Sequence, residues 1–384
     1  MSSRDSNFPR SRSVSFVTPV TVTGVLGLCI LGLCISKSFH TAPLPSRKVF
    51  SAAAPPTMRQ CAECHPEICE TFATAPHRLT LTRAGSPDVR ERFAGLEYSF
   101  PESGLTIRYE SRDDELWLES AALPSPVRVD WIFGSGRHAQ TPVSVITNPD
   151  ERTESLQHRV SWFPTNKLAA TPGLEVGTRE IPGLYDVFQH EDHVVTMDCF
   201  ECHVTHLPNN DGRIDESQII VGVGCERCHP GGREHMSNVG DGPLFVERWS
   251  ELSPLESVNR CGECHRRADQ LTDAELNPDR PVLARFASVG LVMSACFKKQ
   301  AWIDSESPIQ GRLDCLTCHD PHRPASRNLQ FYLEKCLECH GSDDVKAAKC
   351  ASQPMTSNCL PCHMPKQTST DHLEFTDHWI RIPR

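Results

Sequence analysis

Seven copies of the pentapeptide Cys-x-x-Cys-His constrain this chain more than any other feature. They begin at Cys61, Cys199, Cys225, Cys261, Cys315, Cys336 and Cys359. Their second cysteines are Cys64, Cys202, Cys228, Cys264, Cys318, Cys339 and Cys362, and their histidines are His65, His203, His229, His265, His319, His340 and His363. This spacing is the attachment signature of haem c, in which two thiols add to the vinyl groups of one porphyrin and the histidine binds the iron. The motifs predict seven covalently attached haem c groups.

The regularity of the repeat argues against two other readings of a cysteine-rich chain. A structural zinc site needs four ligands, and an adjacent Cys-His is a poor tetrahedral set. A disulfide framework is common in exported proteins, but it gives no reason for a histidine at a constant offset. Five cysteines lie outside the motifs, namely Cys29, Cys34, Cys69, Cys296 and Cys350. Of these, Cys296 and Cys350 either form a disulfide with each other or remain thiols.

Composition limits both the core and the partners. Hydrophobic residues make up 38% of the 384 residues and aromatic residues 7%, which is little for two or three ordinary domains. We therefore expect the porphyrins to supply much of the apolar interior. The formal net charge of −10 disfavours a nucleic-acid partner, because phosphate binding needs a basic surface. A redox protein with a basic docking face fits this charge better.

The segment 14–36 is uncharged and mostly apolar. About 20 such residues span a bilayer as a helix, and Arg10 and Arg12 before it favour a cytoplasmic location for 1–13. We expect a single-pass anchor in the inner membrane, followed by a tether over 37–57 and a haem domain on the periplasmic side. A cleaved signal peptide is the alternative, although no small-x-small cleavage site directly follows the apolar run.

The motifs divide the rest of the chain unevenly, into a first haem segment at 58–92, an intervening region at 93–182 and a six-haem domain at 183–384. The intervening region alternates or clusters β-branched and other apolar residues between turn signals, which predicts strands. The expected strands are 105–110, 115–119, 127–133, 143–147 and 156–163. The predicted fold class is a multihaem cytochrome c, with mainly short α-helices and loops around stacked haems, a small β-rich insertion and an N-terminal transmembrane helix.

Each motif supplies one axial histidine, so the sixth ligand of each iron has to come from elsewhere. Ten further histidines lie beyond the tether: His77, His138, His158, His190, His193, His206, His235, His322, His372 and His378. They are enough to give seven irons two imidazoles each. Methionine is the competing ligand and would raise the reduction potential. Six-coordinate iron favours electron transfer, whereas reduction of a small molecule needs an open iron.

Sequence phrases around the motifs resemble those of the periplasmic multihaem cytochromes c, which include the tetrahaem cytochromes of ammonia oxidisers, the pentahaem nitrite reductases and the octahaem hydroxylamine oxidoreductases. The resemblance covers most of 61–384, and the same phrases mark one subgroup of this superfamily. They are GSGRHAQ at 134–140, GCERCHPGGREH at 224–235, CLTCHDPH at 315–322, CLPCHMPK at 359–366 and TDHWIR at 376–381. In such families a histidine shortly after one motif often binds the iron of a neighbouring haem.

The resemblance implies distal iron ligands at His138, His235, His322, His378, His77 and His372. It leaves the seventh open among His206, His190, His193 and His158, in that order. Two features of the enzymatic families do not appear in this sequence. No motif ends in lysine, as the catalytic motif of the pentahaem nitrite reductases does. None of the four tyrosines stands in a recognisable version of the hydroxylamine oxidoreductase crosslink.

These observations favour an electron carrier over an enzyme. The leading hypothesis is a seven-haem relay that is tethered to the membrane and exchanges electrons with a quinol-oxidising complex or a soluble redox protein. The alternative is an oxidoreductase acting on a small nitrogen or sulfur compound at one open iron, with Arg137, Arg233 or Arg323 near the anion. A third hypothesis is a subunit that docks inside a larger respiratory complex.

Overall fold

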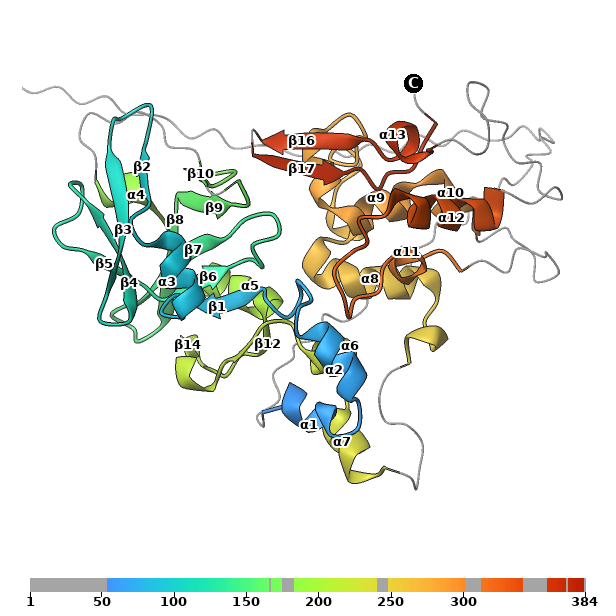
Figure 1. Ribbon diagram of the computed structural model, residues 1–384, viewed down its shortest axis with the longest axis horizontal. Helices are drawn as coiled ribbons and strands as arrows, with labels where there is room; N and C mark the ends of the chain where they lie inside the picture. Colours follow the sequence, from blue (N-terminus) through green and yellow to red (C-terminus); the bar gives the residue numbers. More distant parts are fainter. Residues whose placement is uncertain are drawn as a thin grey trace, which may run out of the picture. The chain divides into compact units, whose positions relative to one another are not determined.

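The computed structural model describes residues 54–165, 167–174, 183–239, 248–300, 312–340, 358–370 and 372–382 (Figure 1). All of them belong to one compact unit, Arg47–Arg384. The predicted anchor, most of the predicted tether and Cys350 lie outside the described residues. No helix within the described ranges is long and apolar enough to cross a bilayer.

The first haem segment consists of two short helices, α1 (Met58–Ala62) and α2 (Pro66–Phe72). Thr57 caps α1, because its backbone N–H donates to Gln60 Oε1 at 2.9 Å and its hydroxyl accepts from the Gln60 N–H at 3.4 Å. Pro66 occupies the first turn of α2, where its missing N–H has no intrahelical partner to lose. The first motif therefore lies between two helices whose starts are set by local sequence.

Two antiparallel sheets follow. The five-stranded sheet has the order β1 (Leu81–Arg83), β6 (Trp131–Phe133), β7 (Thr141–Thr147), β8 (Thr153–His158), β11 (Phe188–Glu191). The four-stranded sheet has the order β2 (Glu97–Ser99), β3 (Thr106–Arg112), β4 (Glu115–Ser120), β5 (Val127–Val129). A further pair joins β9 (Val160–Phe163) and β10 (Lys167–Ala170). Figure 1 shows the short helix α3 (Pro87–Phe93) among these strands.

One apolar core joins the two sheets. Alternate residues of β3 and β4, such as Tyr109 and Leu118, are fully buried, as the period of two in a half-buried strand requires. Ile132 and Phe188 of the five-stranded sheet and Phe93 of α3 belong to the same cluster. This part of the chain therefore has a core made of its own side chains.

The five expected strands are present, and two of them are divided. The chain passes from β5 in one sheet to β6 in the other at Asp130, whose carboxylate accepts from the Val145 N–H at 2.7 Å and pairs with Arg128 at 2.7 Å. The expected strand at 156–163 is divided at Arg159, where β8 ends and β9 begins with a different partner strand. Periodicity predicts the extended segments, but it does not predict a change of sheet.

The remaining chain consists mainly of short helices. They are α4 (Leu184–Val187), α5 (His193–His203), α6 (Cys225–Cys228), α7 (Gly232–Ser237), α8 (Pro254–His265), α9 (Ala287–Met293), α10 (Ala295–Gln300), α11 (Cys315–Cys318), α12 (Leu329–His340) and α13 (Leu360–His363). Single 3-10 turns lie at Glu216–Gln218, Trp249–Glu251, Ala268–Gln270 and Pro281–Arg285.

Strands also occur among these helices, where the sequence predicted mainly short helices and loops. The pairs are β12 (Val204–His206) with β15 (Ile220–Val221), β13 (Asn209–Asn210) with β14 (Arg213–Ile214), and β16 (Lys366–Thr370) with β17 (Leu373–Thr376). The apolar cluster around α8, α9 and α10 has Val258, Leu291 and Phe297 as its buried members among the described residues. This small core fits the expectation that porphyrins provide apolar bulk. The boundaries at 58–92, 93–182 and 183–384 stay predictions.

Candidate haem sites

Every motif lies on or at the end of a helical turn. In four motifs the histidine N–H donates to the carbonyl of the first cysteine, with N···O distances of 2.9 Å for His65, 2.7 Å for His229, 2.9 Å for His319 and 3.0 Å for His363. The helices α5, α8 and α12 end at the histidines of the other three. A single turn of this kind presents both sulfurs and the following imidazole to one porphyrin.

Four motif histidines each face one histidine from outside the motifs. The ring centroids are 6.5 Å apart for His65 and His235, 6.2 Å for His229 and His322, 6.0 Å for His265 and His77, and 6.2 Å for His319 and His378. Two metal–nitrogen bonds of about 2.1 Å and ring radii of about 1.1 Å place two axial imidazoles about 6.4 Å apart. The spacing of all four pairs therefore fits one iron between the rings.

Hydrogen bonds at Nδ1 orient several of these rings. His378 Nδ1–H donates to Thr376 O at 2.9 Å, His203 Nδ1–H to Thr80 O at 2.9 Å and His363 Nδ1–H to Arg381 O at 2.8 Å. A donor role for Nδ1 fixes the tautomer and leaves the Nε2 lone pair for a metal. The sequence did not single out these acceptors, because a backbone carbonyl carries no residue-specific signal.

His322 is held differently, by a carboxylate. Its Nδ1 lies 2.9 Å from Asp320 Oδ1, and Arg323 Nε lies 2.7 Å from Asp320 Oδ2. An acidic partner raises the basicity of a metal-bound imidazole. Asp320 is part of the phrase CLTCHDPH and lies two residues before the predicted ligand His322. This position was the signal in the sequence that could have predicted the contact.

Three histidines are engaged elsewhere. His158 is fully buried in the β core, with Tyr109 Oη at 2.9 Å from Nδ1 and Ser144 Oγ at 3.1 Å from Nε2. This burial lowers its pKa to about 3. The Nε2 of His190 lies 2.7 Å from Glu154, and that of His193 lies 3.2 Å from Arg152 Nη1. The structure therefore does not favour His158, His190 or His193 as the seventh distal ligand.

The other predicted distal ligands face no motif imidazole within ring-contact distance in the described part of the chain. His138 lies 5.1 Å from Phe375 and His372 lies 5.3 Å from Phe163, measured between ring centroids. His206 is 6% exposed in β12. The distal ligands opposite His203, His340 and His363 stay predictions.

Aromatic packing fixes the second motif to the five-stranded sheet. Phe200, inside the motif on α5, is 1% exposed and lies edge-on to Trp131 at 5.8 Å and to Phe133 at 5.0 Å. Phe133 also lies 5.0 Å from the ring of His203. The β-rich region therefore forms one wall beside this motif.

Thiols of different motifs touch one another. The sulfur atoms of three cysteine pairs are close neighbours, namely Cys61 and Cys225, Cys202 and Cys264, and Cys261 and Cys315. These contacts connect the first motif to the third, the second to the fourth and the fourth to the fifth. Attached porphyrins would therefore have neighbouring edges.

The three arginines considered for anion binding contact backbone carbonyls or a carboxylate of the chain itself. Arg137 Nη2 lies 3.5 Å from Ala325 O, Arg233 donates to Ala54 O, and Arg323 pairs with Asp320. These contacts favour structural roles.

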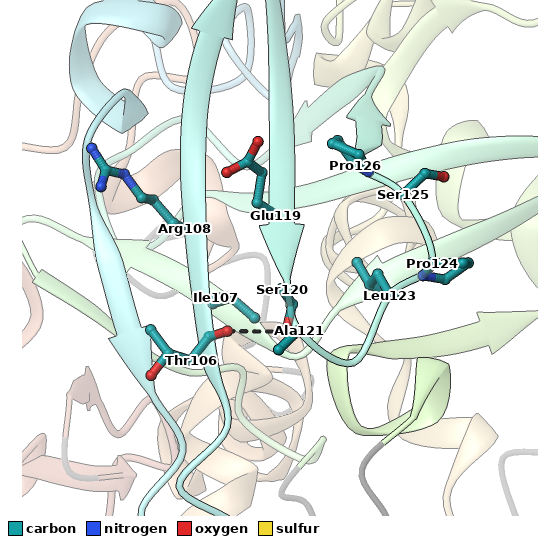
Figure 2. A pocket seen from close by; sticks show the side chains of 10 residues that line it. All are labelled: Thr106, Ile107, Arg108, Glu119, Ser120, Ala121, Leu123, Pro124, Ser125 and Pro126. Carbon is teal, nitrogen blue, oxygen red and sulfur yellow. Dashed lines mark hydrogen bonds between the residues drawn. The ribbon is translucent and has the colours of Figure 1, made fainter.

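A hollow of about 420 Å³ lies on the four-stranded sheet, and Figure 2 shows that strands β3 and β4 and the loop after β4 line it. Its two charged lining residues are engaged by neighbours, since Arg108 pairs with Glu97 at 3.2 Å and Glu119 pairs with Arg112. No lining residue belongs to a haem motif. The hollow therefore has no part in the haem sites.

The sequence is similar to those of known proteins. The family model for cytochrome c554 and c-prime matches residues 160–230. The dissimilatory sulfite reductase MccA of Wolinella succinogenes is 26% identical over 387 residues, which cover 83% of this chain and 52% of that protein. The chain thus spans about half the length of this curated relative.

A solved structure shows the same fold. The outer cell wall cytochrome OcwA superposes with a TM-score of 0.50 at 14% identity, over 84% of this chain and 78% of that one. At this identity the likeness concerns the fold alone. Together with the motifs and the imidazole pairs, these matches support a multihaem cytochrome c that carries haem c.

Proposed function

We propose that this chain is an electron-transfer relay with seven haems, most of them ligated by two histidines. The observation that carries the proposal is the set of four imidazole pairs with centroids 6.0 to 6.5 Å apart. Bound haem supplies one-electron redox chemistry. A distal imidazole closes the sixth position, which excludes substrate and favours electron transfer.

The thiol contacts between motifs support a relay. The cysteine pairs Cys61–Cys225, Cys202–Cys264 and Cys261–Cys315 bring the attachment edges of separate sites together. Short edge-to-edge distances are what electron transfer between cofactors needs. The chain contributes the axial ligands, the burial and the hydrogen bonds that set each potential.

We also propose the cellular setting that the sequence favours. The segment 14–36 would anchor the chain in the inner membrane, with the haem region in the periplasm. Electrons would be exchanged with a quinol-oxidising complex or a redox protein, and a basic face on that partner would complement the net charge of −10. Fractionation of cells that produce the full chain tests the anchor, and recovery in the soluble periplasmic fraction would contradict it.

Intact mass and a pyridine haemochrome assay on one preparation test the haem count. We expect a mass increase equal to seven haems and a haemochrome ratio of seven per chain. A smaller ratio in fully matured protein would refute the count. An electron paramagnetic resonance (EPR) spectrum that contains only low-spin signals would support the relay.

A second candidate is an oxidoreductase with one open iron at His203. The observation in its favour is that His203, within the described residues, has a ring contact with Phe133 at 5.0 Å and none with an imidazole, whereas four other motif histidines face an imidazole. The similar protein MccA is a sulfite reductase, so a small sulfur oxyanion is the substrate to test. Sulfite or cyanide added to the ferric protein should shift a high-spin signal. Absence of both a high-spin signal and a spectral response would rule this candidate out.

A further inference from the structure

The residue before the second cysteine differs in charge between the motifs. It is Glu63, Glu201, Glu263 and Glu338 in four of them, and it is arginine only in the third, at Arg227. At this position of the third motif, an arginine therefore replaces the glutamate that four other motifs carry. Neither the distal-ligand assignment nor the relay itself explains this exchange.

The structure places Arg227 where three motifs meet. It lies on α6, and its Nη2 atom lies 4.0 Å from Cys264 Sγ of the fourth motif. Cys264 in turn contacts Cys202 of the second motif. Arg227 also acts electrostatically on Cys228 of its own motif. One half-buried guanidinium is therefore close to the attachment thiols of three haems.

Carboxylates also act on these thiols, namely Glu201 on Cys202, and Glu263 on Cys228 and Cys264. Glu263, the nearest motif glutamate of the fourth site, forms an ion pair with Arg260 at 3.2 Å. Glu226, the other inner residue of the third motif, accepts hydrogen bonds from the backbone of Gly231 and Gly232. Within the described residues no carboxylate forms an ion pair with Arg227. Arg227 is therefore a cation that opposes these carboxylates at all three thiols.

We propose that Arg227 raises the reduction potentials of the haems attached at Cys199–His203, Cys225–His229 and Cys261–His265, so that electrons gather at this junction of the relay. Reduction adds one negative charge to a haem, and a fixed cation nearby stabilises the reduced form. The Arg227–Cys264 contact is exposed, so water screens part of this interaction. This inference rests on the proposed haem attachment and adds a direction to electron flow.

The test is a potentiometric titration of the holoprotein, followed by visible absorption and by EPR. Arg227→Gln should lower the reduction potential of at least one low-spin component by about 59 mV. For a one-electron couple, this shift corresponds to a tenfold change in the equilibrium constant of reduction. Arg227→Lys retains the charge and should leave the titration close to that of the unaltered protein. Arg112→Gln is the matched control, because it removes an equal charge from the β3–β4 hairpin, where Arg112 pairs with Glu119.

Each outcome decides the proposal. Equal titrations for Arg227→Gln and the unaltered protein, with full haem content in both, would overturn it. The same shift in Arg112→Gln would also overturn it, because net charge would then be the cause. If the Arg227→Gln variant does not acquire its haems, Glu201→Gln is the second variant, and it should raise the reduction potential of at least one component. Absence of such a rise would count against a local electrostatic field at the junction. A haem deficit in the unaltered protein would instead contradict the proposed function.

Discussion

The angle between paired imidazoles predicts the EPR spectrum of the ferric protein. The ring planes of His229 and His322 are 5° apart, whereas those of His265 and His77 are 78° apart. Each imidazole donates π density along one direction. Two parallel rings therefore split the energies of the iron d orbitals strongly, whereas the contributions of two perpendicular rings to this splitting nearly cancel. The combined splitting varies as the cosine of the angle, so the 78° pair retains about one fifth of the splitting of the parallel pair.

This difference separates the signals of these two pairs. The His229–His322 site should give a rhombic low-spin signal, and the His265–His77 site should give the most anisotropic one, with the largest maximal g value. His77→Ala should abolish the anisotropic signal, leave the rhombic one and create one high-spin component. His322→Ala should keep the anisotropic signal, weaken the rhombic signal, to which the His65–His235 pair at 22° also contributes, and create one high-spin component. Both variants need frozen-solution spectra and a haemochrome count to confirm equal haem content.

The control is His190→Ala, because His190 is paired with Glu154 at 2.7 Å and faces no motif histidine among the described residues. Its spectrum should match that of the unaltered protein. The reasoning fails if His77→Ala removes the rhombic signal, or if it creates no high-spin iron while the haem content is complete.

The remaining predictions concern an ion pair, a buried base and the β core. Asp320→Asn weakens the acidic hydrogen bond to His322, so the potential of the haem at Cys225–His229 should rise in a redox titration, and a fall would contradict this. His158 has its pKa lowered from 6.5 to about 3, so the unfolded chain binds its proton more readily and stability is lost as the pH falls below about 6.5. Between pH 7 and pH 5 this loss is about 2 kcal/mol, and thermal melts should show a smaller loss in His158→Gln. Leu118→Ala empties a fully buried site in the core of the sheets, which should cost about 2–5 kcal/mol in a denaturant titration followed by circular dichroism. The haem spectrum of this folded variant should remain unchanged.

Local patterns predicted much of the molecule. The covalent chemistry is encoded within five consecutive residues, so the motifs predicted haem c without any knowledge of the fold. Alternation along β3 and β4 predicted strands, because burial on one face of a sheet has a period of two. The divided strands at Asp130 and Arg159 were not predictable in this way, since a change of sheet depends on which neighbour each segment meets.

By itself, the sequence predicted where haems attach and determined which histidines were available as partners. The tertiary structure decided which partner meets which motif, because His77 and His265 come together only through the path of the chain between them. It also decided that His158 serves the β core, since the groups that occupy its two nitrogens, Tyr109 and Ser144, come from other strands. The physical reason is the same in both cases. Bond-forming motifs act over one helical turn, whereas axial pairs and buried hydrogen bonds require groups that only folding brings together.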